Sequence, residues 1–162
     1  MPPARSKPLD PAVREARKRA LEERFDHAED QWAQAIRAHR LAPPDAGFAG
    51  RLRTLSEAAA AEAEVAREAS ELGLAWRPLP GAQSAEPPYE LRPGTGRRGP
   101  PELWQRFDTA VARFNRAAAG TDAAAVADAH AELSAVALEL ADAVEAEDRA
   151  AARPARRDAG AA

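Results

Sequence analysis

Residues Trp104 to Val144 read WQRFDTAVARFNRAAAGTDAAAVADAHAELSAVALELADAV, and this stretch decides the fold. Apolar side chains recur in it at alternating spacings of three and four residues, which is the pattern of one helical stripe. The pattern predicts two helices, one supplying bulky side chains and the other small ones that let the two backbones approach closely. The stripe residues are Trp104, Phe107, Val111, Phe114 and Ala118 in the first part, and Val126, Ala129, Leu133, Val136, Leu140 and Val144 in the second.

A short turn separates the two predicted helices, which we place at Pro101–Ala119 and Asp122–Glu147. Gly120 is suited to the left-handed conformation that ends many helices. Thr121 is suited to accept an N-cap hydrogen bond, and Asp122 adds negative charge at the positive end of the new helix dipole. A connection this short makes the helices antiparallel neighbours.

A second pair of helices is predicted upstream, near Asp10–Leu41 and Asp45–Leu72. Asp10 and Pro11 are typical of an N-cap and a first helical position. Two consecutive prolines separate the helices, and Gly73 is a natural C-cap. The large apolar residues of the first helix are few, so the core depends on a sparse set of bulky side chains.

We therefore predict an all-α fold: a four-helix bundle of two antiparallel hairpins joined by a long connector rich in proline, glycine and arginine. Residues 1–9 are expected to form a disordered lead-in. Residues 10–148 are expected to form a single helical domain, with hairpins at 10–73 and 101–148 and the connector at 74–100. Residues 149–162 are expected to form a disordered basic, alanine-rich tail.

The composition argues for a cytoplasmic protein. The chain has no cysteine, which excludes a disulfide frame and thiol chemistry, and it has no apolar run long enough to span a membrane. Its net charge is −3, but residues 122–148 hold eight acidic and no basic residues. We expect faces of opposite sign to pair within the fold or across a dimer.

The connector contains the most distinctive local sequence, PYELRPGTGRRGPPELW at residues 88–104. It matches G-x-G-x-x-G, but a dinucleotide site needs flanking strands, and a second helix follows instead. The remaining hypothesis is a loop whose backbone amides and arginines hold a phosphate or carboxylate. The candidate ligand- or partner-binding residues are Tyr89, Arg92, Gly94, Gly96, Arg97 and Arg98.

The alternative interpretation makes this segment a turn-rich connector. Its arginines would then pair with acidic helix faces such as Glu139, Asp142 and Glu145. Because it also contains large apolar residues, including Trp76, we expect part of it to pack across the bundle.

No residue pattern indicates an enzyme, a metal site or a cofactor. The histidines lack H-E-x-x-H spacing, and no E-x-x-H pair typical of di-metal bundles is present. His130 lies beside Val126 and Leu133, so we interpret it as a histidine at the core edge. None of the serines has a nucleophile signature.

We therefore expect a non-enzymatic helical interaction or regulatory protein whose partner is another protein or a second copy of itself. The alternative is a module that binds an anion, a phosphate ligand or a nucleic-acid backbone through residues 89–99. Overall acidity argues against strong binding to nucleic acid, and no membrane partner is expected.

Overall fold

The computed structural model describes residues 7–41, 47–77 and 98–159, and these residues form four helices and no strand. The helices are α1 (Pro11–Leu41), α2 (Phe48–Glu71), α3 (Pro101–Ala118) and α4 (Ala123–Ala159). The predicted all-α bundle is therefore confirmed. No described helix is both long enough and apolar enough to cross a membrane.

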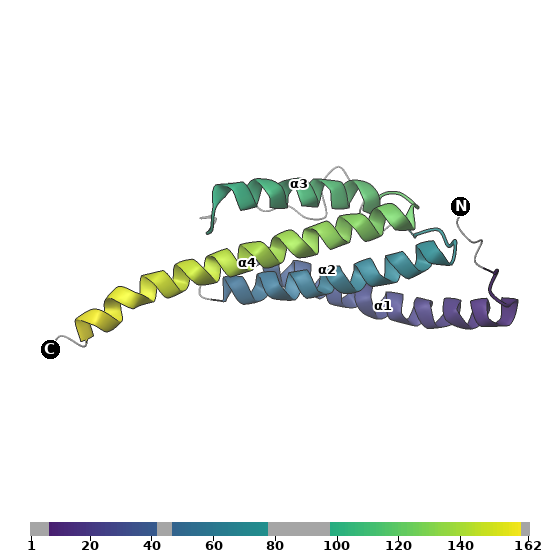
Figure 1. Ribbon diagram of the computed structural model, residues 1–162, viewed down its shortest axis with the longest axis horizontal. Helices are drawn as coiled ribbons and strands as arrows, with labels where there is room; N and C mark the ends of the chain where they lie inside the picture. Colours follow the sequence, from purple (N-terminus) through teal and green to yellow (C-terminus); the bar gives the residue numbers. More distant parts are fainter. Residues whose placement is uncertain (1–6, 42–46, 78–97, 160–162) are drawn as a thin grey trace.

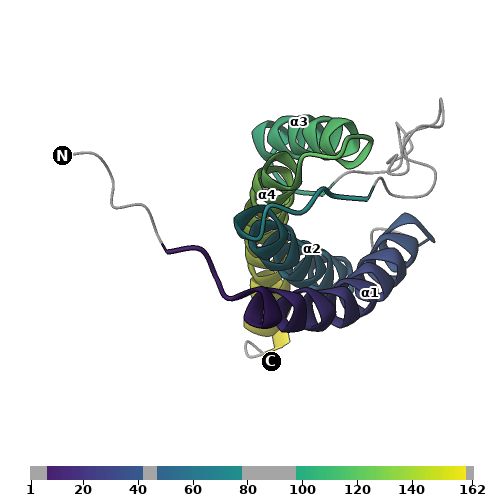
Figure 2. The same cartoon turned by 90° about the vertical axis from the view of Figure 1, so that its right-hand side faces the viewer.

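The helices form two antiparallel hairpins, α1 with α2 and α3 with α4 (Figure 1). The end-on view in Figure 2 shows them in the order α3, α4, α2, α1. The most extensive contact is between α2 and α4, which join the two hairpins. The row is bent, because the Trp32 ring of α1 reaches the Phe114 ring of α3 at a centroid distance of 5.1 Å.

This arrangement requires more than a tight turn between α2 and α3. Since α4 is antiparallel to both α2 and α3, the helices α2 and α3 run parallel (Figure 1). The chain must therefore return along the bundle between the end of α2 and the start of α3. The return distance is about 27 Å, the length of the 18-residue helix α3. A short loop could not connect two parallel helices in this way.

The contact between α2 and α4 is close because small side chains line it. Ser56 donates its hydroxyl hydrogen bond to the Ser134 carbonyl at 2.7 Å, and Ser134 donates to the Ser56 carbonyl at 2.8 Å. Because each short serine side chain reaches the backbone carbonyl of the other helix, the two backbones must lie close together. Alanines at positions 59, 63, 137 and 141 are buried with them.

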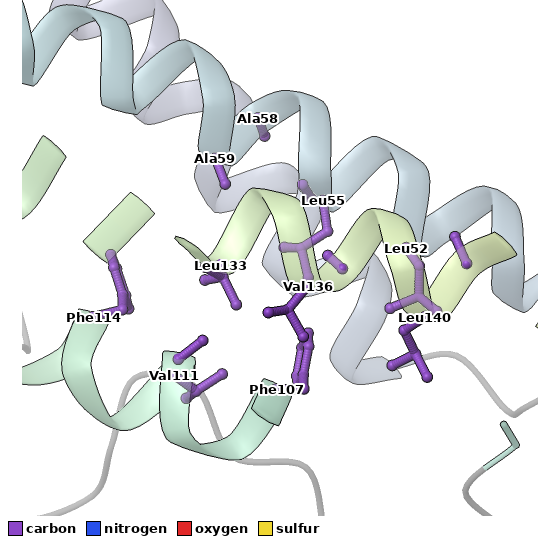
Figure 3. Close-up of a cluster of buried hydrophobic side chains, with 14 of the residues drawn as sticks. Leu52, Leu55, Ala58, Ala59, Phe107, Val111, Phe114, Leu133, Val136 and Leu140 are labelled. Carbon is purple, nitrogen blue, oxygen red and sulfur yellow. The ribbon is translucent and has the colours of Figure 1, made fainter. Parts of the chain in front are cut away.

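Two clusters of buried apolar side chains form the core. The larger one draws on all four helices, and Figure 3 shows its centre, where leucines of α2, aliphatic residues of α4 and phenylalanines of α3 interdigitate. The smaller one lies between α1, α2 and the start of α4, with Trp76 from the connector. The sparse bulky residues predicted from the stripes, such as Phe107, Phe114 and Leu133, are buried.

The helix ends follow the predicted signals in two places. The Asp10 carboxylate accepts a hydrogen bond from the Ala12 amide at 3.1 Å, as expected of an N-cap. Gly73 has a φ of 67°. The Leu74 amide donates to the Ala69 carbonyl at 2.9 Å, which completes a Schellman C-cap.

Two predictions at the turn between α3 and α4 were wrong. The cap of α4 is Asp122 and not Thr121, because the Asp122 carboxylate accepts from the amides of Ala124 and Ala125. Gly120 is not left-handed, since Gly73 and Gly99 are the described residues with positive φ. The α3 helix closes instead through a tight turn in which the Gly120 amide donates to a carbonyl three residues earlier.

The ends of α2 and α4 also differ from the sequence prediction. The helix α2 begins at Phe48, with Gly47 as N-cap, and Asp45 lies outside the described residues. The helix α4 continues to Ala159 instead of ending at Glu147. Alanine has the highest helix propensity, and extending an existing helix needs no new nucleus, so the alanines after Glu147 favour this continuation. The helix also includes Pro154, which by itself disfavours a helix interior.

The segregated charges pair within the fold, as expected. Arginines from α2, α3 and the end of the connector reach acidic residues of α4, and Figure 1 shows α2 and α3 on either side of α4. The pairs are Arg53 with Asp142 and Glu145, Arg106 with Glu139, Arg113 with Glu132, and Arg98 with Asp148.

Candidate functional site

The loop site predicted from the sequence falls mostly outside the described residues. This applies to Tyr89, Arg92, Gly94, Gly96 and Arg97, so anion or partner binding by this loop stays a prediction. The sixth residue, Arg98, lies against the bundle.

The end of the connector is fixed to α4 and α3 through Arg98 and Gly99. The Arg98 guanidinium pairs with Asp148, and the Arg98 carbonyl accepts a hydrogen bond from the Trp104 indole at 2.7 Å. Gly99 has a φ of 100°, and a Cβ there would lie 3.0 Å from Leu140 Cδ1. Arg98 thus pairs with an acidic helix face, as the connector interpretation expects, although its partner is not one of the three residues named for that role.

The start of the connector is fixed at the opposite end of α3. The Trp76 amide donates to the Thr121 carbonyl at 2.8 Å, and the Trp76 ring packs edge-on against Phe25 at 4.9 Å. The Arg77 guanidinium lies over the Phe25 ring, 4.7 Å from the ring centroid. Both described ends of the connector are therefore packed on the bundle.

A buried carboxyl group on α2 is the most unusual polar feature of the interior. Glu62 is 0% exposed, and neither of its oxygens has a hydrogen-bond partner among the described residues. Burial disfavours the charged form and raises the pKa of Glu62 from 4.5 to about 8, with a further contribution from the negative charge of Glu29 on α1. At neutral pH this carboxyl therefore holds its proton.

His130 on α4 is also fully buried, inside the core and not at its edge as the sequence had suggested. Its ring lies 5.3 Å from Trp32 and 4.6 Å from Phe114. Burial lowers the pKa of His130 from 6.5 to about 4, opposed by the hydrogen bond to the Val126 carbonyl. The ring is thus neutral at pH 7.

The hydrogen bond to Val126 fixes the tautomer of His130. A carbonyl oxygen can only accept, so the His130 Nδ1, at 3.0 Å, carries the proton. The Nε2 atom is then a bare acceptor, and within the part of the chain that the structure describes it has no partner. Glu62 therefore contributes a protonated carboxyl to the interior, and His130 contributes an acceptor atom without a partner among the described residues.

The register of α2 and α4 places these two groups at nearly the same level of the bundle. Ser56 lies opposite Ser134, and the helices are antiparallel. Moving six residues along each helix from that point brings Glu62 level with residue 128, about 3 Å along the axis from His130. We call Glu62, His130 and the half-buried Glu29 the buried polar layer.

The sequence contains one signal for Glu62 that the stripe interpretation missed. Glu62 lies four residues after Ala58 and three before Val65, both on the apolar stripe of α2, so helical spacing puts it on the buried side. Its neighbours Glu57 and Glu64 are exposed. A glutamate at a position that helical spacing assigns to the apolar stripe is therefore the sequence signal for this buried carboxyl group.

Two open surface grooves lie elsewhere. One, of about 340 Å³, runs between α1 and α2 and is lined by Glu23, His27 and Glu64 among others. The second, of about 490 Å³, lies at the α3–α4 turn beside Arg113 and Arg116. Within residues 7–41, 47–77 and 98–159, no group of three or more His, Asp or Glu side chains is arranged to hold a metal ion.

The fold and these sites define an all-α protein of the helical-bundle class, built from two hairpins with a returning connector. Comparison with protein-family models, with curated proteins and with solved structures found no match to this chain.

Proposed function

We propose that the chain is a non-enzymatic helical interaction protein that self-associates through the first turns of α1. The observation that carries the proposal is an exposed apolar stripe on this part of the helix. Leu9 and Val13 are 45% and 46% exposed, and Ala16 and Ala20 are exposed with them. Figure 1 shows that this part of α1 extends beyond the end of α2.

The stripe is spaced as one helical face and lies away from the buried side of α1. Val13, Ala16 and Ala20 recur at intervals of three and four residues along α1, and Leu9 lies just before the helix begins at Pro11. The buried face of the same helix is formed by Leu21, Phe25, Ala28 and Trp32, which follow a different phase. The stripe is therefore not part of the bundle core.

A second copy of the chain fits this stripe because the stripe is self-complementary. In an antiparallel pair of α1 helices centred between Val13 and Ala16, each valine faces the alanine of the other copy, and the two Leu9 residues, which precede the helices, lie at the ends of this contact. Large side chains thus meet small ones, as a two-fold contact requires. The same register sets Asp10 level with Arg19 of the second copy, which brings opposite charges together.

The contact is expected to be weak. Covering the exposed halves of two leucines and two valines contributes about 1 kcal/mol each, before the cost of association. Dimerisation is therefore expected at high micromolar protein, where sedimentation velocity or light scattering measures it.

A matched pair of variants tests the contact. Val13→Glu places a charge in the proposed interface and should leave a monomer at high micromolar protein. Leu138→Glu is the control, because Leu138 is 44% exposed on α4 and lies outside the stripe. A wild-type protein that stays monomeric, or a Val13→Glu variant that associates like wild type, would refute self-association through α1.

A further inference from the structure

We infer that the docking of α1 onto the bundle is controlled by the proton on Glu62. In this mechanism α1 stays packed on the other helices while the Glu62 carboxyl is neutral. It separates from them, and is called released, when the carboxyl is ionised. The inference does not depend on self-association, since it concerns the interior of a single chain.

The geometry of the buried polar layer supports the inference. Glu62 lies on the side of α2 that packs against α1 and α4, is fully buried, and has both oxygens without a partner among the described residues. From α1 it is faced by Glu29, whose charge is of the same sign. From α4 the buried titratable group near this level is His130, which is neutral, whereas Asp128, level with Glu62, is exposed. The adjacent turns of α2 supply alanine and valine, and α3 packs on α4.

An ionised Glu62 therefore has no cation to pair with in its described surroundings. The nearby arginines of α1, Arg17 and Arg24, are engaged at the surface with Glu68. A buried unpaired carboxylate is costly, and the least costly response is to let water reach it.

The helix that can move to admit water is α1. The helices α2 and α4 are locked by the reciprocal bonds of Ser56 and Ser134 and by their close alanine packing. The helix α3 packs on α4, away from Glu62. By contrast, the extensive backbone packing of α1 is with α2. Releasing α1 exposes Glu62 while leaving the other three helices together.

The pH window follows from the two states of the carboxyl group. When α1 is released, Glu62 is solvated and ionises near its ordinary pKa of 4.5, whereas in the closed form its pKa is about 8. Between pH 4.5 and about 8, Glu62 is ionised in the released form and protonated in the closed form. Release therefore becomes about tenfold more favourable per pH unit as pH rises, and it levels off above pH 8.

His130 acts in the opposite direction at lower pH. Its pKa is about 4 when buried and 6.5 when solvated, so a form that exposes it binds a proton as pH falls through this range. The two effects oppose one another between pH 4.5 and 6.5. The Glu62 effect is therefore measured most clearly between pH 6.5 and 8.

Hydrogen exchange followed by mass spectrometry tests the inference at low micromolar protein. After correction for intrinsic exchange rates, the protection of α1 amides should fall about fifteenfold from pH 6.5 to 8, because Glu62 is already half ionised in the closed form at pH 8, while the protection of α3 and of the middle of α4 stays constant. In Glu62→Gln the α1 protection should not change with pH. The control Glu64→Gln, at an exposed position on the same helix, should behave as wild type.

Glu62→Met provides a second variant in case the buried amide of Glu62→Gln disturbs folding, and it too should show no pH dependence. The inference is overturned if α1 protection in the wild type does not change between pH 6.5 and 8. It is also overturned if the variants at position 62 keep the wild-type change, or if all four helices lose protection together.

Discussion

Replacing Glu62 by methionine is expected to stabilise the folded protein, by an amount that grows with pH. Methionine is similar in length, favours helix and carries no charge, so it can occupy the same buried volume. The substitution removes a carboxyl group that is 0% exposed and has no hydrogen-bond partner within the described part of the chain.

The magnitude follows from the pKa of Glu62 in the two states. The folded value is about 8 and the ordinary value, which applies on unfolding, is 4.5. Between them the unfolded chain binds fewer protons than the folded one, so the free energy of unfolding falls by about 1.4 kcal/mol per pH unit as pH rises. From pH 5 to 7.5 the ionisation of Glu62 should lower the free energy of unfolding of the wild type by about 3 kcal/mol. Glu62→Met should show no such decrease.

Urea unfolding followed by circular dichroism at pH 5 and pH 7.5 measures this difference. Glu64→Met serves as the control, because Glu64 is exposed two residues further along α2. The stability gained by Glu62→Met over wild type should be about 3 kcal/mol larger at pH 7.5 than at pH 5. An equal gain at both pH values, or a variant less stable than wild type at pH 7.5, would show that the carboxyl is not held neutral by burial.

Three further predictions test other parts of the structure. His130→Phe should raise the free energy of unfolding relative to wild type by about 2 kcal/mol more at pH 4.5 than at pH 6.5, measured by urea unfolding, because the buried ring has a pKa of about 4 and resists protonation; an equal difference at both pH values would contradict this. Gly99→Ala should cost about 1–3 kcal/mol, since φ is 100° and the new Cβ would lie 3.0 Å from a leucine methyl of α4. Gly50→Ala, at a helical position with nothing within 4 Å, should instead stabilise by up to about 1 kcal/mol, and thermal unfolding of the pair distinguishes strain from a general glycine effect. A double-mutant cycle of Ser56→Ala and Ser134→Ala should give a coupling energy of about 1–2 kcal/mol, and additive effects would mean that the reciprocal bonds do not link α2 to α4.

The sequence by itself determined the helices and several of their ends, because these depend on neighbours along the chain. Apolar spacing along Trp104 to Val144 predicts two stripes, and their bulky residues are buried. Asp10 and Gly73 cap the helices as predicted, since each cap involves groups only a few residues apart. Where two adjacent residues could both act as the N-cap, as with Thr121 and Asp122, the sequence prediction selected the wrong residue.

Only the tertiary structure decided how the helices combine. The parallel course of α2 and α3, which excludes a tight turn between them, follows from which faces of α2 and α4 meet, and helical spacing does not specify this. The burial of Glu62 has the same origin: its environment is formed by α1 and α4, which are far away in the sequence. A pKa depends on surrounding charge and solvent access, and both are set by packing between helices.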